Sequence, residues 1–409
     1  MIIEKRIKDF EKLGFGMFVH FGLYSILESG EWIKHHANIP FEEYKQLKEK
    51  FNPEKDWAKK LVSTAKAAGC KYITLTSRHH EGFSLYDTCG LNEFDAPHSP
   101  AGRDLVREFV DACNEEGIIP FFYHTLLDWS IPSYKENFPE YLSYLRKSVE
   151  LLCKNYGKIG GIWFDGTWDR PNDDWEEDKL YSLIRSYQPD AMIINNTGLG
   201  ARGALGHIEL DSVTFERGNP SPINMDDSPK YIASEMCQTF GEHWGYAAKD
   251  FNFKSLANII EDLCSCRRYG ANFLLNVGPK ANGYLRPLDE AMLISLGEWV
   301  NIQSEAIYLP RPSGIDVEGN TKNFILEYDG AYYLFSHGIK IEGDINVTIG
   351  GERSNCVDRF NFEKEIRSMR WIDDGSEVAF EQKDGVVTVL PSKFSYGTQL
   401  VVRIAKIEV

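Results

Sequence analysis

Short apolar runs alternate with stretches of helical periodicity along the chain up to about residue 300. Strands that are apolar throughout are typical of parallel sheets, because helices cover both faces of such sheets. The predicted strands cover residues 16–22, 72–76, 118–124, 161–166, 191–196 and 272–278. The predicted helices cover residues 57–69, 104–116, 141–156, 178–187 and 253–269.

This alternation predicts a (β/α)8-like TIM barrel, because about seven or eight strand–helix units fit a closed barrel better than an open sheet. A doubly wound nucleotide-binding sheet would carry a glycine-rich phosphate motif after its first strand, and no such motif follows residue 22. Residues 198–248 lack the regular alternation. We therefore expect two units of the barrel to be irregular there.

After about Pro310 the pattern changes to short alternating segments separated by Gly, Asp and Asn, which is typical of an antiparallel β-sandwich. The predicted strands of this part cover residues 324–328, 332–337, 345–349, 378–381, 386–390 and 399–404. The sequence thus predicts a barrel over residues 1–309 and a β-sandwich domain over residues 310–409.

The formal net charge of −16 argues against nucleic acid or an anionic membrane surface as a partner. No stretch of about 20 apolar residues predicts a membrane-spanning helix. The N-terminal residues do not resemble a secretory signal, so we expect a cytoplasmic protein. The eight cysteines form no CxxC pair, which favours free thiols over disulfides or structural zinc.

Polar and titratable residues recur where the predicted barrel strands end. Active sites of TIM barrels lie at the carboxyl ends of the strands, so these residues predict a polar pocket at the mouth of the barrel. The residues at these positions are His20, His79, His80, Tyr123, His124, Trp163, Asp165, Asn195 and Asn196.

Asp165 follows the apolar run GIWF and precedes a glycine, which places its carboxylate at the mouth of the barrel. Such a group could attack an electrophilic carbon or bind a metal. Hydrolysis of a glycoside requires a second carboxyl group for acid/base catalysis. Glu216 lies at the end of a short strand-like run and is one candidate, Glu235 is a competing one, and Glu31 is better suited to holding sugar hydroxyls beside Trp32.

The ordered runs FGMFVHFGLYS, GEWI, TSRHHEGFSLYDT, FFYHTLLDW, IWFDGTW, WGY and GANFLLNVGPKANG resemble the α-L-fucosidases of glycoside hydrolase family 29, over about residues 13–308. The resemblance implies a retaining exo-glycosidase that forms a covalent fucosyl-enzyme, with Asp165 of the W-x-D motif as nucleophile. Its T-x-E pattern favours Glu216 as the acid/base. Glu235 stays a possible alternative, although Ser234 replaces the tryptophan that usually precedes that glutamate.

The resemblance also implies a pocket for fucose, with an aromatic residue facing the methyl group of the sugar. The implied binding residues are His20, Glu31, Trp32, His79, His80, Tyr123, Trp163 and, at the methyl group, Trp244. An arginine common in the family is replaced by Thr197, and Arg202 or Arg217 could substitute for it. No metal or cofactor is implied, and the expected substrate is a fucosylated oligosaccharide. The GEWIKHH and TFERGNP segments lean toward α-1,3 and α-1,4 linkages.

Two other functions are compatible with the same residues and are kept as alternatives. A metal-dependent barrel hydrolase could bind its metal through the histidines and Asp165, but such sites usually take an H-x-H pair on the first strand, where this chain has only His20. A non-catalytic carbohydrate-binding protein would keep the histidines and lose a carboxylate, whereas Asp165 and a candidate partner are both present.

Overall fold

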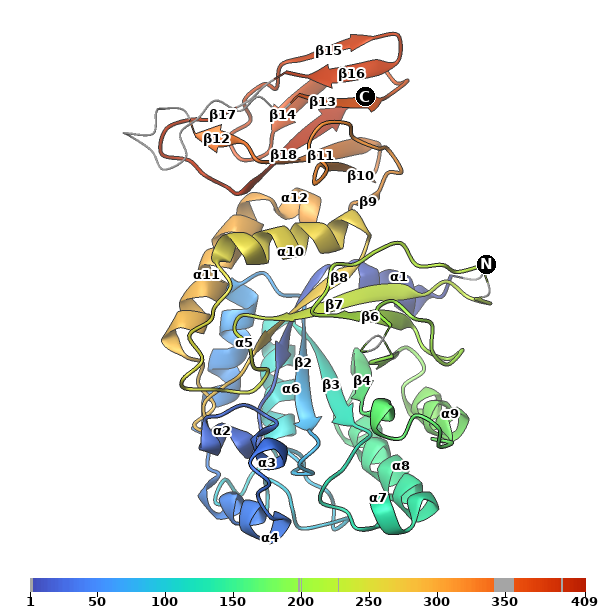
Figure 1. The fold of residues 1–409 in the computed structure, drawn as a ribbon, viewed down its shortest axis with the longest axis vertical. Helices are drawn as coiled ribbons and strands as arrows, with labels where there is room; N and C mark the ends of the chain where they lie inside the picture. Colours follow the sequence, from blue (N-terminus) through green and yellow to red (C-terminus); the bar gives the residue numbers. More distant parts are fainter. Residues whose placement is uncertain (1–2, 198, 200, 227, 342–356, 391–392) are drawn as a thin grey trace. The chain divides into compact units, whose positions relative to one another are not determined.

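The computed structural model describes residues 3–197, 199, 201–226, 228–341, 357–390 and 393–409. The chain forms two compact units (Figure 1). The first comprises Met1–Phe253 and Asn272–Ile294, and the second comprises Lys254–Ala271 and Ser295–Val409. The second unit thus includes Lys254–Ala271, which precedes the last barrel strand in the chain. The domain boundary predicted at residue 309 stays a prediction.

The first unit is built around a closed barrel of parallel strands that follow one another in chain order, β1 to β8. Strand β1 closes the barrel, because Phe18 pairs with Thr74 of β2 on one side and with Asn276 of β8 on the other. The predicted TIM barrel is therefore confirmed. The strands are β1 (Phe15–Val19), β2 (Tyr72–Arg78), β3 (Ile119–Thr125), β4 (Gly161–Asp165), β5 (Met192–Asn195), β6 (Ser212–Glu216), β7 (Ala233–Thr239) and β8 (Asn272–Val277).

Amphipathic helices follow the first four barrel strands and pack apolar side chains inward. In α6 the side chain of Asp104 accepts a hydrogen bond from the backbone N–H of Arg107, and Gly117 ends the helix at a φ of 71°. The longer helices are α1 (Lys5–Glu11), α5 (Trp57–Ala67), α6 (Leu105–Glu116), α8 (Phe138–Asn155), α9 (Glu177–Tyr187), α10 (Leu256–Arg268) and α11 (Pro287–Ile302). None of the helices in the described part of the chain has the length and apolarity needed to span a membrane.

The barrel is irregular between β5 and β7, as predicted for residues 198–248. Among the described residues of this region, no helix separates β5 from β6 or β6 from β7 (Figure 1). Strand β5 pairs with β6 only at Ile194 and Ser212, whereas β6 and β7 pair over five residues. The loops that leave the carboxyl ends of these strands therefore run without a covering helix.

Aromatic side chains fill the interior of the barrel. The rings of Tyr123 and Trp163 are stacked with centroids 5.7 Å apart, and Phe18 packs edge-on against Trp163 at 5.2 Å. At the amino-terminal end, Phe10 of α1 packs against Tyr72 and Phe121. This packing gives the carboxyl-terminal end of the barrel a rigid aromatic floor.

The second unit contains antiparallel sheets that share one core, which confirms the predicted β-sandwich. The core joins Leu334 and Ile407 of the larger sheet to Phe360 and Val387 of the smaller one. The larger sheet has the order β14 (Ser368–Trp371), β18 (Val402–Glu408), β11 (Ala331–His337), β10 (Phe324–Tyr328) and β9 (Arg311–Pro312). The smaller sheet has the order β13 (Asp358–Asn361), β16 (Val386–Val389) and β15 (Phe380–Lys383), and β12 (Lys340–Ile341) pairs with β17 (Lys393–Phe394).

Two predictions for this part of the chain fall on residues that the structure does not describe. The strand expected at 345–349 and Cys356 both lie outside the described residues. The seven cysteines within the described residues are free; six of them are buried, and Cys89 is exposed.

Candidate active site

A pocket of about 210 Å³ opens where the barrel strands end. Every strand from β1 to β7 supplies a residue to it, either from its last positions or from the residues that follow. The lining residues are Phe18, His20, Trp32, His79, His80, Tyr123, Trp163, Asp165, Trp168, Asn196, Leu199, Glu216, Cys237 and Trp244. The structure thus brings most of the residues predicted from the strand ends into one cavity.

Asp165 is the last residue of β4, and three side chains hold its carboxylate. The Tyr123 hydroxyl donates to Oδ2 at 3.2 Å, while Trp168 Nε1 and Asn196 Nδ2 donate to Oδ1 at 3.2 and 3.3 Å. Gly166 follows at a φ of 112°, and the turn it makes returns Trp168 to the same carboxylate. The carboxylate is therefore fixed in orientation and remains accessible from the pocket.

Glu216 is the last residue of β6 and accepts a hydrogen bond from the same amide nitrogen, Asn196 Nδ2, at 2.6 Å. Since this nitrogen lies 3.3 Å from one carboxylate and 2.6 Å from the other, the two bonded oxygens are at most 5.9 Å apart, the sum of these distances. The Thr214 hydroxyl donates to Asn196 Oδ1 at 3.0 Å, which orients the amide so that its NH₂ group faces both carboxylates.

The pKa of Glu216 lies above its ordinary value. Burial is the main cause, and the negative charge of Asp165 is the second. A carboxyl group with a raised pKa can carry a proton near neutral pH and deliver it, which is the property required of a general acid. The two carboxyl groups thus have different environments, because Asp165 is held by three donors and Glu216 by one.

The three histidines of the pocket are buried, and burial lowers the pKa of His20 to about 3 and that of His80 to about 4. Asn276 Nδ2 donates to the carbonyl of Trp244, so Asn276 Oδ1 must accept from His20 Nδ1 at 2.6 Å. His20 Nε2 is then an acceptor. Neutral imidazoles of this kind can exchange hydrogen bonds with the hydroxyl groups of a sugar. The described residues contain no group of three or more His, Cys, Asp or Glu side chains arranged to hold a metal ion.

Four of the predicted site residues do not line the pocket. His124 Nε2 bonds with Ser148 Oγ of α8 at 2.7 Å, and Asn195 Nδ2 donates to the Tyr181 hydroxyl of α9 at 3.1 Å, so both side chains contact covering helices. Glu235 occupies the third position of β7 and is fully buried inside the barrel, where it accepts hydrogen bonds from the Tyr72 hydroxyl and from Trp163 Nε1. Burial raises its pKa to about 7. Glu31 is also buried, and it accepts a hydrogen bond from the backbone N–H of Gly245 at 2.7 Å. Glu235 thus lies beneath Trp163, and Glu31 fixes the loop that carries Trp244.

The three residues considered in connection with the missing arginine also lie outside the pocket lining. The Thr197 hydroxyl donates to the carbonyl of Ala204, and Arg202 donates to the backbone carbonyls of Glu216 and Arg217. Arg217 stacks on the ring of Trp244 at 4.9 Å. Arg202 therefore stabilises the backbone behind Glu216, while Arg217 lies at the edge of the pocket.

The comparisons with known proteins agree with this geometry. The sequence profile of the α-L-fucosidase family matches residues 4–305. The chain belongs to this family, glycoside hydrolase family 29. The tissue α-L-fucosidase of Mus musculus is 29% identical, over 96% of this chain and 91% of its own.

Solved structures of α-L-fucosidases have the same fold. Isoenzyme 1 of Paenibacillus thiaminolyticus is 28% identical, superposes with a TM-score of 0.83 and covers 99% of this chain and 98% of its own. A family 29 α-L-fucosidase of Bacteroides thetaiotaomicron, solved as a trapped covalent intermediate in complex with 2-fluoro-fucosyl fluoride, is 24% identical. It covers 100% of this chain and 96% of its own, with a TM-score of 0.81.

Several residues of this fucosidase pocket were not predicted from the sequence. Trp168 donates to Asp165 and lies 5.8 Å from the ring of Trp32, and its only signal was the second tryptophan of IWFDGTW. Cys237 and Leu199 are apolar and resemble ordinary core residues in the sequence. Asn196 was predicted at a strand end, but its contact with both carboxylates could not be predicted.

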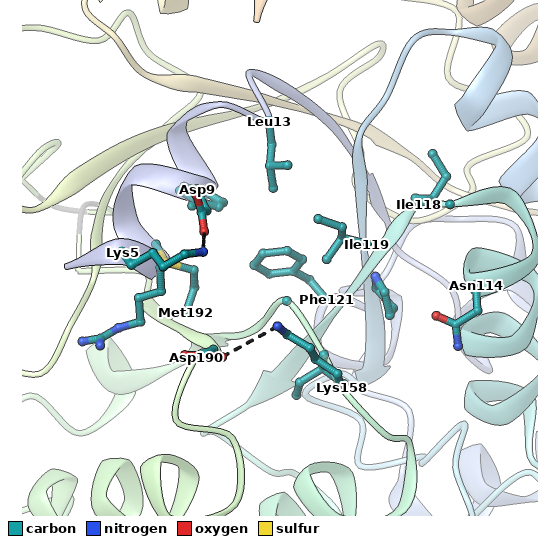
Figure 2. Close-up of a pocket in the computed structure, with 16 residues that line it drawn as sticks. Lys5, Asp9, Leu13, Asn114, Ile118, Ile119, Phe121, Lys158, Asp190 and Met192 are labelled. Atoms are coloured by element: carbon teal, nitrogen blue, oxygen red, sulfur yellow. Dashed lines mark hydrogen bonds and ion pairs between the residues drawn. The ribbon is translucent and has the colours of Figure 1, made fainter. Parts of the chain in front are cut away.

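A larger cavity of about 520 Å³ lies at the amino-terminal end of the barrel of this α-L-fucosidase family member. Figure 2 shows Phe121, Ile119 and Leu13 around it, with charged side chains at its rim. These charges pair with each other, since Lys5 bonds Asp9 and Lys158 lies 3.7 Å from Asp190. Its lining carries no pair of carboxyl groups that share a hydrogen-bond donor, so the smaller pocket is the candidate active site.

Proposed function

We propose that this protein hydrolyses terminal α-L-fucosides with retention of configuration, through a covalent fucosyl-enzyme. The proposal depends on the shared Asn196 amide, which limits the separation of the bonded Asp165 and Glu216 oxygens to 5.9 Å. Retaining glycosidases place their two carboxyl groups about 5–5.5 Å apart, whereas inverting enzymes need about 6.5–9.5 Å to admit a water. The spacing favours direct attack by a carboxylate.

In the first step Glu216 donates its proton to the glycosidic oxygen while Asp165 attacks the anomeric carbon. The bond to the leaving group breaks through an oxocarbenium-like transition state, whose positive charge the Asp165 carboxylate stabilises. In the second step Glu216 takes a proton from water as the water oxygen attacks the anomeric carbon, and the bond from that carbon to Asp165 breaks, which releases the Asp165 carboxylate. The raised pKa of Glu216 and the fixed orientation of Asp165 support this division of roles.

The remaining residues of the pocket suit a 6-deoxy sugar. His20, His79 and His80 offer neutral ring nitrogens to hydroxyl groups, because burial lowers the pKa of each imidazole. Trp163 and Trp244 provide apolar surface for a ring face and a methyl group. The proposal further assigns a preference for α-1,3 and α-1,4 linked fucose, which the GEWIKHH and TFERGNP segments support.

The test compares 4-nitrophenyl α-L-fucoside with an α-1,3/4-fucosylated trisaccharide, each with and without EDTA, and follows the released sugar by NMR. We expect release of fucose whose first-formed anomer is α, no effect of EDTA, and a higher kcat/KM for the trisaccharide. First-formed β-fucose would contradict the retaining mechanism, and loss of activity in EDTA would favour the metal-dependent alternative. Release of fucose from neither substrate would reject the proposed function.

A further inference from the structure

A second cavity of about 450 Å³ adjoins the candidate active site. Trp32 and Trp244 line both cavities, so the two cavities adjoin at these side chains. The second cavity is formed by the loop after β1, by the residue that follows β6, and by the loop after β7. That residue is Arg217, directly after Glu216 in the chain.

We propose that this cavity is the subsite for the leaving group, that it binds a saccharide of about two rings, and that Arg217 determines specificity for it. The inference rests on the proposed function, because the leaving group must lie beside the acid that protonates its oxygen. Glu216 lies on the wall of the first pocket, and Arg217 lies on the wall of the second.

Beside Asp165, aromatic side chains pack against Trp32. The ring of Trp32 lies 5.1 Å from that of Trp129 and 5.8 Å from that of Trp168, and Trp168 is bonded to Asp165. A leaving group placed between these rings would have to displace them. The cavity beside Arg217 offers space that is already formed.

The guanidinium group of Arg217 is held in place and has spare donor capacity. It stacks on Trp244 at 4.9 Å, and Nη2 donates to the carbonyl of Glu242 at 2.7 Å. Its Nε is buried and has no hydrogen-bond partner. Nε is closed to a ligand, whereas Nη1 donates to none of the described residues, so an oxygen atom of a ligand can accept a hydrogen bond from Nη1.

The acidic side chains of the same cavity are already bonded to the protein. Glu31 accepts from the Gly245 N–H, and Glu242 accepts from Asn252 Nδ2 at 2.7 Å. The cavity therefore offers a donor at Arg217 and aromatic surface at Trp32 and Trp244, which together suit an acceptor oxygen and the apolar face of a sugar ring. Its volume, about twice the 210 Å³ of the first pocket, leaves room for about two rings.

The test measures kcat/KM of Arg217→Gln on 4-nitrophenyl α-L-fucoside and on an α-1,3/4-fucosylated trisaccharide. We expect a loss of about 10- to 100-fold for the trisaccharide, mainly as a higher KM, because a hydrogen bond from a charged donor is removed. The aryl fucoside should lose several-fold less than the trisaccharide, since its small leaving group does not reach the guanidinium and only the support that Arg217 gives to Trp244 is removed. Activity on the aryl fucoside also reports that the variant is folded.

The control is Lys34→Gln, which removes one positive charge on the same side of the barrel, over the ring of Trp129 at 5.6 Å. We expect the ratio of the two kcat/KM values to be unchanged in this variant. Equal losses for both substrates in Arg217→Gln, or no loss in either, would overturn the leaving-group subsite. If wild-type protein releases fucose from neither substrate, the proposed function fails instead, so the two failures are distinguishable.

Discussion

Asp165 and Glu216 differ in what their removal should do, although both contact the amide of Asn196. Asp165→Ala should reduce kcat on 4-nitrophenyl α-L-fucoside to less than about one thousandth, because no group remains to form the covalent intermediate. Azide should restore part of the rate by attacking the anomeric carbon in place of the carboxylate. The product is then β-fucosyl azide, identified by NMR, and retention of a few per cent of the wild-type kcat without azide would exclude Asp165 as nucleophile.

Glu216→Ala should discriminate between leaving groups. Substrates whose leaving group needs protonation should lose about 100-fold or more in kcat/KM, whereas the aryl fucoside, with its good leaving group, should lose less. Azide then attacks the intact fucosyl-enzyme and gives α-fucosyl azide. The configuration of the azide product therefore separates the two roles, and an α-azide from Glu235→Ala instead would reverse the assignment.

Glu235 should make the stability of the protein depend on pH. Its pKa of about 7 in the folded state lies above the ordinary value of 4.5, so between these values the folded protein holds a proton that the unfolded chain has lost. Stability then falls as pH rises from about 4.5 to about 7, by up to about 3 kcal/mol. Glu235→Gln should lack this part of the decline and unfold at a higher temperature than wild type at pH 8, as calorimetry would measure. If the unfolding temperature of Glu235→Gln falls between pH 5 and pH 8 by as much as that of wild type, the prediction is wrong.

The strand ends were sufficient to predict most residues of the pocket. The sequence could not separate Glu216 from Glu235, because both lie in barrel strands and only their positions along those strands differ. Glu216 is the last residue of β6, whereas Glu235 is the third of seven in β7. A strand that mixes apolar and polar residues gives no sharp signal of where it starts, so depth within the barrel could not be predicted.

At the scale of elements, the end of β4 depends on Gly166. Its φ of 112° is rarely adopted by other residues, and a Cβ there would lie 2.7 Å from the backbone nitrogen of Leu127. Gly166→Ala should therefore shift Asp165, lowering kcat at least tenfold and the free energy of unfolding by about 1–3 kcal/mol. Gly157→Ala is a matched control, because its φ of 72° is also positive but a Cβ there meets nothing within 4 Å. Equal kinetics in the two variants would contradict the argument.

The elements that were predicted well are those with continuous apolar sequences. Strands β2, β3, β4 and β8 all begin within a residue of the predicted start, because each is buried on both faces. Strands β6 and β7 carry Thr214, Glu235 and Gln238 and are not followed by the helical pattern that marks a barrel unit. Thr214 and Glu235 are satisfied by tertiary hydrogen bonds, which a local pattern does not reveal.

At the scale of the whole molecule, helix α10 belongs to the second compact unit. Within that unit, Arg268 donates to the carbonyl of Thr321 and Lys322 pairs with Glu261. The chain was predicted to divide after residue 309 because the sequence pattern changes there, but sequence patterning does not report which elements share contacts. The barrel and the sandwich could thus be predicted as folds, whereas the grouping of α10 could not.

Truncation after residue 309 should therefore not give an independently stable barrel. The fully buried Arg267 donates to the carbonyl of Ala271, directly before β8, and also reaches the carbonyl of Pro310. Removing residues 310–409 leaves α10 without the strands it packs on. We expect the shortened chain to be largely insoluble or to unfold at least 10 °C below the full chain by circular dichroism. A soluble, active fragment with an unchanged melting temperature would contradict this.

In the proposed mechanism, the charge of Asp165 also gives the reaction an internal timing. Part of the raised proton affinity of Glu216 comes from the negative charge of Asp165. When Asp165 becomes an ester, that charge disappears, and Glu216 becomes a stronger acid at the moment when it must remain ionised to accept a proton from water. When the ester is hydrolysed the charge returns, and Glu216 regains its preference for a proton before the next substrate arrives. The alternation between acid and base thus requires no movement of the chain, only the making and breaking of one bond at its neighbour.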